Sequence, residues 1–351
     1  MSIFNGKNIS IKIYGQSHSQ KIGVKVKGFP SFKFDREKLQ EFLARRKPSG
    51  GVFSTSRKED DAPIFYGVEG DQINGEWTAE IINSNAHSKD YNSLYGKPRP
   101  SHADYVWHVK DGTYDFSGGG RFSGRLTAPL CIVGGIAKEY LQILGIEVLA
   151  YVSSVGNVKA KSFKQEKITP EMIKEGIKID FPSLSKKQEI LEEILSAKKQ
   201  GDSVGGCVEC IVYNLKAGYG DNLFSGLEGK IASLLYSIPA VKGVEFGLGF
   251  GFVDKRASSV NDEFFFDGDQ VKTKTNNSGG INGGISNGNE ITMSVAFRPT
   301  PSILKEQNTV DLINKENTKI KIEGRHDACI VPRAVPCVES AVALAILDEI
   351  L

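Results

Sequence analysis

Apolar and polar residues alternate near the start of the chain, and this period of two is the feature that most limits the fold. The pattern is found in ISIKI at residues 9–13 and again in IGVKV at residues 22–26. Successive side chains of a strand point to opposite faces of a sheet, so these stretches predict two half-buried strands in a hairpin-like pair. The same alternation in ITMSVAF at residues 291–297 predicts another strand late in the chain.

Segments with helical patterning are interspersed with these strands. Asp35 begins a helix that brings Arg45 and Arg46 to its end, and Ser185 with Gln188 forms a capping box for a charged helix that stops before Gly201. Residues 228–237 and 338–351 predict two further helices. Helices mixed with antiparallel-looking strands favour an α+β fold over a doubly wound parallel sheet.

The length and the composition set limits on domains and partners. A chain of 351 residues suggests about two domains, yet no linker rich in Pro, Gly or Ser divides it. The 44 Lys and Arg nearly balance the 42 Asp and Glu, so no overall basic field points to nucleic acid or to a membrane. The first residues do not form a secretory signal, and no apolar run of about 18 residues could span a bilayer.

The cysteines favour a reducing compartment, which we expect to be the cytoplasm. Their number, five, is odd, and they are scattered along the chain. Cys207 and Cys210 have the C-x-x-C spacing of redox and zinc sites, but they lie in a strand-like stretch where residues three apart face opposite sides. Because no second pair or nearby His completes a metal site, we interpret both as ordinary core residues and expect no metal.

Two glycine clusters are candidate binding loops. They are SGGGRFSGR at residues 117–125 and SGGINGGISNG at residues 278–288. Neither has the register of a dinucleotide fingerprint or of a phosphate loop, so the pattern argues against the usual nucleotide-binding folds. Glycines still let the backbone come close to a ligand, and a helix that starts after Arg121 would offer N–H groups to an anion; tight turns are the alternative explanation.

Arginines and histidines recur beside these loops. The guanidinium group matches carboxylate and phosphate geometry, so several arginine-bearing loops indicate a ligand with several anionic groups. Histidine titrates near neutrality and can donate a proton to a leaving phosphate. For any one of these side chains, a solvated arginine or a structural histidine remains the simpler interpretation. The five histidines are His18, His87, His102, His108 and His326.

In its short sequence motifs and in their order, the chain resembles the chorismate synthase family from one end to the other. The matching stretches include YGQSHS, LARRKPSGG, RPSHADY, SGGGRFSGRLTA, SIPAVKGVEFG, SGGINGGISNG, FRPTPSI and GRHDACIVPRAVP. The match is weakest over residues 158–197, 253–275 and 305–319.

The resemblance implies a fold, a reaction and a set of partners. The implied fold is a single domain over residues 1–351, a β-α-β sandwich with helices between antiparallel sheets, assembled as a homotetramer. The implied reaction is the anti 1,4-elimination of phosphate from 5-enolpyruvylshikimate 3-phosphate, giving chorismate in the shikimate pathway to aromatic amino acids. The implied cofactor is reduced FMN (FMNH2), without net redox change; NADPH acting through a separate reductase is one source of its electrons.

The resemblance also assigns roles to individual residues. His102 corresponds to the acid toward the departing phosphate and His18 to a proton or hydrogen-bond donor to the reduced flavin, while Asp327 and Ser17 correspond to a relay for the flavin N5 proton. The expected substrate contacts are Arg46, Arg99, Arg125 and Arg325. The expected flavin contacts are Arg121, Phe122, Ser123, Pro239, Ala240, Gly283, Arg298, Pro299, Thr300, Pro301, Ser302 and Arg325.

Several positions depart from the family pattern and keep alternatives open. Val52 stands where a second arginine is expected, Leu126 where an acidic residue is expected, and Pro239 where an asparagine is expected. His87 replaces an arginine, and Gln16 and Ser19 replace a glutamate and a glycine beside His18. The main alternative is therefore a flavin- or phosphometabolite-binding protein of the same fold that has lost turnover. A flavin oxidoreductase that uses nicotinamide directly is less favoured, because the chain has no dinucleotide fingerprint.

Overall fold

The first sheet is built from the amino-terminal strands. A computed structural model describes the chain except for residues 48–60, 84–93, 115, 117, 179–180 and 323–325. The strands of this sheet are antiparallel in the order β1-β2-β3-β5-β4, and β2 pairs with β3 as the alternating pattern predicts. Their bounds are β1 (Ser2–Asn5), β2 (Ser10–Tyr14), β3 (Lys21–Lys33), β4 (Ile64–Glu69) and β5 (Gln72–Ile82).

The second sheet comes from the later part of the chain and is also antiparallel, in the order β7-β6-β8-β14-β9. Its strands are β6 (Glu147–Val155), β7 (Val158–Lys159), β8 (Gly206–Tyr213), β9 (Val241–Phe246) and β14 (Ile291–Phe297). The strand predicted from ITMSVAF is thus confirmed as β14. Cys207 and Cys210 both lie in β8, and all five cysteines are free thiols.

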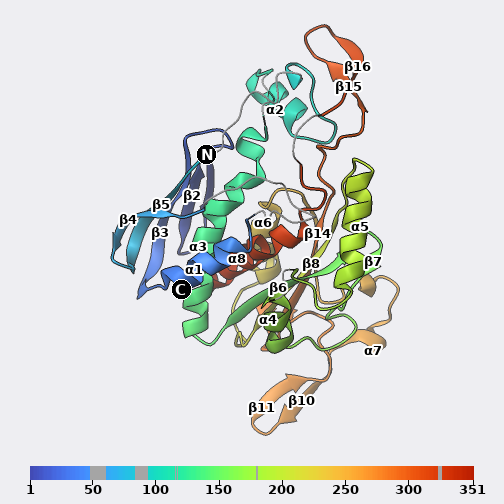
Figure 1. Ribbon diagram of the computed structural model, residues 1–351. Coiled ribbons are helices and arrows are strands. Elements are labelled where there is room, and N and C mark those ends of the chain that lie inside the picture. Colours follow the sequence, from blue (N-terminus) through green and yellow to red (C-terminus); the bar gives the residue numbers. More distant parts are fainter. Residues whose placement is uncertain (48–60, 84–93, 115, 117, 179–180, 323–325) are drawn as a thin grey trace.

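Four helices lie between the two sheets (Figure 1). They are α1 (Arg36–Ala44), α3 (Thr127–Ile143), α6 (Leu227–Tyr236) and α8 (Val331–Ile350). α8 packs on α3 and α6 and against β6 and β8, and nearly all of its side chains are buried. The outer helices α4 (Pro170–Lys178) and α5 (Lys187–Lys199) pack on β6 from the other face of the second sheet.

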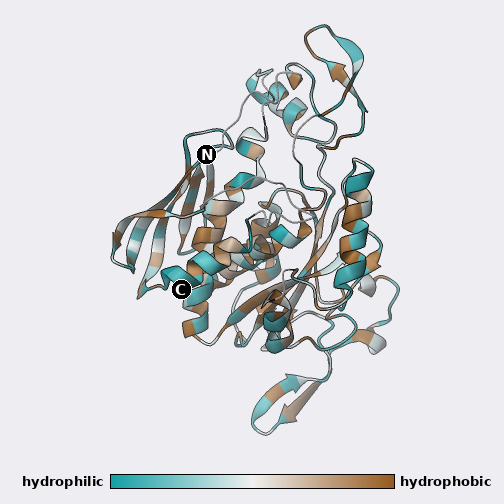
Figure 2. Cartoon of the chain, in the orientation of Figure 1, coloured by the Kyte–Doolittle hydropathy of each residue, from teal (hydrophilic) through white to brown (hydrophobic). Residues whose placement is uncertain are grey.

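One apolar core joins both sheets through this helix layer. The largest cluster of buried apolar residues contains Ile22 and Trp77 from the first sheet, Ile136 and Leu344 from the helices, and Val208 from the second sheet. In Figure 2 brown segments accordingly gather in the strands and the inner helices, while α5 keeps a teal outer side. The predicted α+β fold is confirmed; the single domain over residues 1–351 stays a prediction, which this shared core supports.

The remaining elements lie at the periphery. The hairpins β15–β16 and β10–β11 project from opposite ends of the molecule, and α2 lies near the first of them (Figure 1). These elements are α2 (Asp104–Asp111), α7 (Ala257–Val260), β10 (Phe264–Asp267), β11 (Gln270–Thr273), β12 (Ile281–Asn282), β13 (Ile285–Ser286), β15 (Gln307–Asp311) and β16 (Glu316–Ile320).

Two of the predicted helix starts are corrected by the structure. The capping box of Ser185 and Gln188 is wrong: the residue before α5 is Lys186, in a left-handed conformation, and the Ser185 hydroxyl accepts a hydrogen bond from the Lys161 backbone at 3.0 Å instead. The last helix starts at Val331 rather than at residue 338. Pro332 occupies its first turn, where a missing N–H is tolerated, and the buried helix also accommodates Pro336.

Candidate active site

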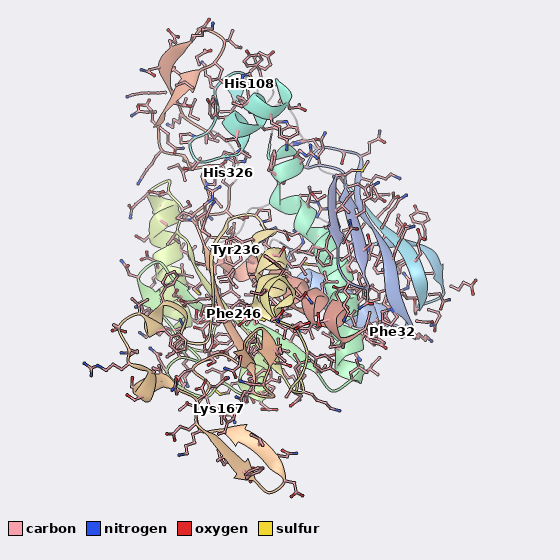
Figure 3. The ribbon with its side chains drawn as sticks, turned by 180° about the vertical axis from the view of Figure 1, so that it is seen from behind. Phe32, His108, Lys167, Tyr236, Phe246 and His326 are labelled. Carbon is pink, nitrogen blue, oxygen red and sulfur yellow. The ribbon has the colours of Figure 1, made fainter. Side chains whose placement is uncertain are left out.

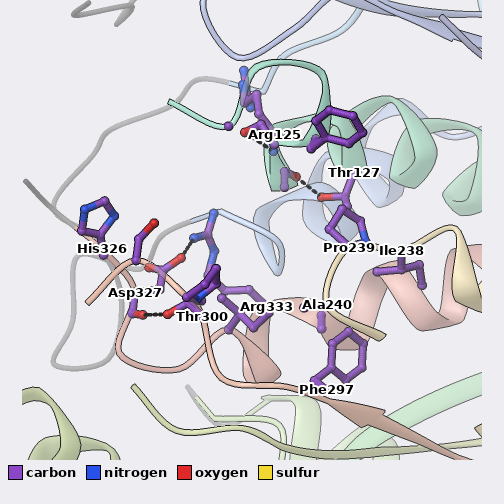
Figure 4. A pocket seen from close by; sticks show the side chains of 18 of the residues that line it. Arg125, Thr127, Ile238, Pro239, Ala240, Phe297, Thr300, His326, Asp327 and Arg333 are labelled. Atoms are coloured by element: carbon purple, nitrogen blue, oxygen red, sulfur yellow. Dashed lines mark hydrogen bonds and ion pairs between the residues drawn. The ribbon is translucent and has the colours of Figure 1, made fainter. Parts of the chain in front are cut away.

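The first of two adjoining cavities lies where the amino-terminal ends of α3 and α8 meet the carboxyl-terminal ends of α1 and β14. The second lies beside it, between the residues that follow β2, helix α2 and the segment around Gly119. Their volumes are about 310 Å3 and about 570 Å3, and Gly118, Gly119 and Phe122 line both. Figure 4 shows the first cavity, with Arg125 and Pro239 on one side and His326, Asp327 and Arg333 on another. Within the described part of the chain, five arginines line this first cavity, namely Arg46, Arg99, Arg125, Arg298 and Arg333.

Three of these arginines are unusually buried for charged side chains. The exposed fractions are 3% for Arg46, 4% for Arg99 and 9% for Arg125. A guanidinium group is seldom buried unless carboxylates compensate its charge. Among the described residues that line the cavity, the arginines outnumber the single carboxylate, Asp327, so this part of the wall favours an anionic ligand.

Asp61 holds two of the arginines together. Its fully buried carboxylate accepts hydrogen bonds from both Arg46 and Arg125, and Arg125 Nε also donates to Asn83 Oδ1 at 3.1 Å. Burial alone would raise the pKa of Asp61, but the charges and hydrogen bonds of the two guanidinium groups lower it below the usual value. Asp61 thereby holds the two guanidinium groups close together beside the cavity.

His102 is held by a second ion pair. Arg99 forms a two-pronged contact with Asp104, with Nε at 2.7 Å from Oδ2 and one terminal nitrogen at 2.8 Å from Oδ1. His102 Nδ1 lies 2.5 Å from the same Oδ1 and 3.1 Å from Arg99. Nδ1 cannot donate to Asp104 and accept from Arg99 at once, and the closer carboxylate favours the tautomer with a proton on Nδ1.

The charge of Asp104 is secured by these contacts. Burial acts to raise its pKa, but the hydrogen bonds from Arg99 and His102 bring it down to about 2. The carboxylate is therefore ionised at neutral pH and holds the His102 ring through Nδ1. His102 lines the first cavity, so the ring can present Nε2 to a ligand there.

His18 and Ser17 lie on the second cavity rather than the first. Their side chains contact each other, with Ser17 Oγ 2.8 Å from His18 Nδ1. Gly118, which separates them from the first cavity, has a φ of 58°, and a Cβ at this position would come within 2.3 Å of His18 Cε1. Only glycine fits there, so the glycine cluster lets His18 approach the wall that the two cavities share.

Asp327 lies on the first cavity and pairs with an arginine that the sequence analysis did not select. Arg333 donates to Asp327 Oδ2 at 2.5 Å and to the Arg46 carbonyl at 2.9 Å, while Thr300 Oγ1 donates to the Asp327 carbonyl at 3.0 Å. Arg333 thereby connects the start of α8 to the end of α1 and to Asp327, and Thr300 joins the loop after β14 to Asp327 (Figure 4). The structure brings Asp327 and Ser17 to different cavities.

Most of the expected flavin contacts gather on one wall. Ser123, Pro239, Ala240, Arg298, Thr300, Pro301 and Ser302 line the first cavity, Phe122 lines both, and Arg121 lines the second. Pro299 lines neither cavity, and Gly283 is exposed in the turn between β12 and β13. Arg325, Val52 and His87 lie outside the described residues.

The wall also contains a strained residue. Ala240 has a φ of 73°, which a residue with a Cβ seldom adopts, and its carbonyl accepts the Arg298 N–H at 3.0 Å. Such outliers persist where the surrounding structure holds them and are common at binding sites.

Asp61, Asp104 and Arg333 are the site residues that the sequence analysis missed. Asp104 and Arg333 stand inside the quoted stretches RPSHADY and GRHDACIVPRAVP, so the resemblance had marked their surroundings. Asp61 had no local signal, because its role depends on two arginines that are distant in sequence.

Within the described residues, no group of three or more His, Cys, Asp or Glu side chains could hold a metal ion. In the same part of the chain, no helix has both the length and the apolarity to cross a membrane.

Comparison with protein families gives one family over nearly the whole chain. A family model described as chorismate synthase matches residues 9–351. Two curated relatives with that name, from Methanobrevibacter smithii and Thermococcus kodakarensis, are 41% and 42% identical, over 99% of this chain and 95% and 97% of their own lengths. A third from Phocaeicola vulgatus is 41% identical, over 98% of this chain and 96% of the relative.

A solved structure shares the fold. It is described as a crystal structure of chorismate synthase and has a TM-score of 0.76 at 24% sequence identity. The match covers 99% of this chain and 93% of the other. At this identity the likeness concerns the fold, which agrees with the sheet and helix layers of the present chain.

Proposed function

The chain belongs to the chorismate synthase family, and from this premise we propose that its arginine-lined cavity binds 5-enolpyruvylshikimate 3-phosphate. The activity is that of the family, a carbon–oxygen lyase reaction that eliminates phosphate and forms chorismate for the synthesis of aromatic amino acids. The substrate carries one phosphate and two carboxylates, and the five arginines of the cavity supply matching charges. The arrangement of Asp61 between Arg46 and Arg125 keeps two of them in fixed positions before the substrate arrives.

His102 is the proposed acid toward the departing phosphate, and its contact with Asp104 is the observation that carries this role. Asp104 accepts from Nδ1, so Nε2 is the nitrogen that gains and donates the catalytic proton. The negative charge of Asp104 stabilises the charged ring, while Arg99 holds Asp104 in place from the other side. The pair thus orients the ring and sets its tautomer, and the arginines stabilise the negative charge that the leaving phosphate acquires.

Reduced FMN is the proposed cofactor, and the residues present fit it. The wall formed by Ile238, Phe297 and Ile330 offers apolar surface for a ring system, and Arg298 lies beside it with Thr300 and Ser302, which suits a phosphate. When bound in its reduced form, the flavin supplies electron density to the reacting substrate without net oxidation. The substitution at Pro239 removes a side-chain amide but leaves this apolar wall intact.

His18, Ser17 and Asp327 are proposed to serve the flavin side of the reaction. His18 faces the shared wall at Gly118, with Ser17 Oγ in contact with its Nδ1, so the ring can hold a proton near that wall. Asp327 lies on the first cavity in an ion pair with Arg333. A relay between Ser17 and Asp327 therefore has to pass through the boundary between the cavities.

A homotetramer in a reducing compartment, the cytoplasm, is the proposed state of the protein. Large apolar side chains stand exposed in and near the β10–β11 hairpin, among them Phe250, Phe264 and Phe266 with exposed fractions of 83%, 68% and 77%. Contiguous exposed apolar residues favour burial against another copy. The five free thiols are compatible with a reducing environment.

An anaerobic assay of phosphate release tests the function. We expect purified protein to release phosphate and form chorismate when FMN is reduced with dithionite, and not when the same FMN is oxidised. Equal turnover with oxidised FMN would refute the requirement for reduced flavin. Tight binding of flavin and substrate without turnover would instead identify a binding protein of the same fold, the alternative that Val52 and Leu126 motivate.

A further inference from the structure

A pair of thiols lies at the floor of the arginine-lined cavity. Cys337, in the second turn of α8, lines the cavity, and Cys131, in the first turns of α3, lies behind it. The two Sγ atoms are 3.8 Å apart, and Cys131 donates its S–H to Cys337. Both side chains are buried, with exposed fractions of 0% for Cys131 and 3% for Cys337. The cavity is therefore the route by which a small reagent reaches this pair.

Close helix packing holds the two thiols together. Gly134, one turn after Cys131, faces Ser340, one turn after Cys337, and a Cβ at Gly134 would come within 2.1 Å of the Ser340 Cβ. Near the same contact, Lys138 Nζ donates to Glu339 at 2.6 Å. At Gly134 the backbone of α3 lies directly against the Ser340 side chain of α8. The two helices therefore cannot separate beside the thiols without unpacking the core. A disulfide has an S–S length of about 2.0 Å, so side-chain rotation has to close the remaining gap.

The environment of Cys337 favours its thiolate. The hydrogen bond from Cys131 lowers the pKa of Cys337 against the effect of burial, and the charges of Arg46 and Arg333 act in the same direction. Burial and the neighbouring Cys337 raise the pKa of Cys131, which keeps its proton. The thiolate is the reactive form of cysteine, so the two members of the pair differ in role.

The other cysteines lack this arrangement. Burial raises the pKa of Cys207, Cys210 and Cys329, and none of the three lines either cavity. They are internal controls for any reagent that acts through the cavity.

We propose that Cys131 and Cys337 form a reversible thiol–disulfide couple at the floor of the cavity, in which hydrogen peroxide oxidises Cys337 and Cys131 resolves the product. The Cys337 thiolate attacks peroxide; an S–O bond forms, the O–O bond breaks, and hydroxide leaves. Cys131 then attacks this sulfur; an S–S bond forms, the S–O bond breaks, and water leaves. Two thiols lose two hydrogen atoms, and one peroxide is reduced to two waters.

The couple protects the cavity from a permanent negative charge. Without a resolving thiol, further peroxide converts a sulfenic acid to a sulfinic acid, which thiol reductants do not reverse. A sulfinate at Cys337 would stand beside Arg46 and Arg333 and compete with anionic ligands. The disulfide instead stops the oxidation at a stage that dithiothreitol reverses.

Peptide mass spectrometry of the full chain tests the proposal. Flavin-free protein is treated with hydrogen peroxide, denatured, alkylated and digested. We expect a linked peptide pair containing Cys131 and Cys337, lost again on treatment with dithiothreitol, while Cys207, Cys210 and Cys329 are alkylated. Inorganic phosphate, used as a probe that fills the cavity, should slow the reaction several-fold. A different linkage, or oxidation of another cysteine before Cys337, would overturn the proposal.

A variant pair separates the two roles. In Cys131→Ala we expect Cys337 to proceed to sulfinic acid, with no recovery in dithiothreitol, whereas the control Cys329→Ala should still form the reversible linkage. Full recovery of Cys337 thiol in Cys131→Ala would show that Cys131 does not resolve it. If Cys131→Ala does not fold, brief peroxide treatment of the parent chain with dimedone present should label Cys337, and a label on Cys131 would reverse the assignment.

Discussion

His102 provides the most direct test of the catalytic assignment at the scale of single residues. We expect His102→Ala to bind flavin and substrate but to lose about 10²- to 10⁴-fold in turnover, because the leaving phosphate no longer receives a proton from a positioned acid. Single-turnover rates with pre-reduced FMN measure this step without interference from flavin reduction. Turnover within a few-fold of the parent, with binding intact, would move the assignment to His18.

His108 is the matched control for that experiment. Its Nδ1 contacts the Thr113 carbonyl at 2.8 Å and its ring packs on Tyr114, with the ring centroids 4.5 Å apart. His108 lies on α2, above His326 in the view of Figure 3, and it lines neither cavity. His108→Ala should therefore turn over at nearly the parent rate.

Arg125 tests the charge of the cavity. We expect Arg125→Ala to weaken substrate binding by about 1.5 to 3 kcal/mol, the range of a lost charge-assisted hydrogen bond, which is about 10- to 100-fold in affinity. Asp61 keeps Arg46 as a partner in this variant, so the fold should survive. The measurement is equilibrium binding of the substrate, with the exposed Arg256→Ala as the control. Unchanged affinity in Arg125→Ala would show that Arg125 serves only the structure.

The site residues that could be predicted from sequence are those that lie in distinctive sequence motifs. RPSHADY selected Arg99 and His102, and ARRKP selected Arg46, before any contact was known. Their partners were not selected, because a carboxylate such as Asp61 acquires its role from two arginines that only the fold brings to it. Arg333 was missed although its stretch was quoted, since nothing in the order of residues shows that it meets Asp327.

At the scale of elements, Glu339 joins three helices and a strand. The buried carboxylate of this α8 residue accepts from Arg45 at the end of α1, from Lys138 on α3 at 2.6 Å, and from the Ala150 backbone of β6 at 3.0 Å. We expect Glu339→Ala to lower the free energy of unfolding at neutral pH by about 3 to 5 kcal/mol, because it leaves two cations uncompensated. Urea denaturation followed by fluorescence measures this. The exposed Glu306→Ala, which loses a surface ion pair with Lys319, should match the parent.

The same residue predicts a dependence on pH. Burial raises the pKa of Glu339, but Arg45 and Lys138 outweigh it and lower the pKa from 4.5 to about 2. Below 4.5 the unfolded chain binds a proton that the folded chain does not, so the stabilisation is present above this pH and is lost as the pH falls towards 2. The difference in unfolding free energy between the parent and Glu339→Gln should narrow over this range. A constant difference would show that the charge of Glu339 does not matter.

Helix ends were the least predictable elements. The Ser185 hydroxyl does not cap α5. It accepts a hydrogen bond from the backbone N–H of Lys161, a residue distant in sequence that the fold brings beside it. The start of α8 was placed too late, since Pro332 and Pro336 read as breakers in a sequence. Burial on all sides offsets the hydrogen bond that Pro336 lacks, and burial is not visible in a local pattern.

At the scale of the whole molecule, the exposed hairpin predicts how the chain assembles. Phe264 and Phe266 stand two residues apart on β10 and therefore share one face. If this face is buried in a homotetramer, the double variant Phe264→Ser, Phe266→Ser should sediment as a smaller species. The control is Lys272→Ser on β11 of the same hairpin. A tetramer of unchanged mass in the double variant would place the interface elsewhere.

The strand and helix types of this architecture could be predicted from sequence, and their arrangement could not. Alternation at residues 9–13 and 291–297 correctly indicated strands, yet it contains no information on which sheet each strand joins. The order β7-β6-β8-β14-β9 pairs strands that are far apart in the sequence, as when Gly206 of β8 lies opposite Phe297 of β14. The layer of helices between sheets was expected from the family resemblance alone.

The central place of α8 has a consequence for how the chain is made. A ribosome synthesises the chain from its amino terminus, and domains commonly begin to fold during synthesis. Here α8, which packs on α3, on α6 and on the second sheet, emerges after the strands of both sheets. Its Asp348 also accepts hydrogen bonds from the backbone N–H groups of Lys7, Asn8 and Ile9, between β1 and β2. Until then the inner face of the second sheet lacks this helix, and nascent chains stalled before residue 331 are expected to need chaperones.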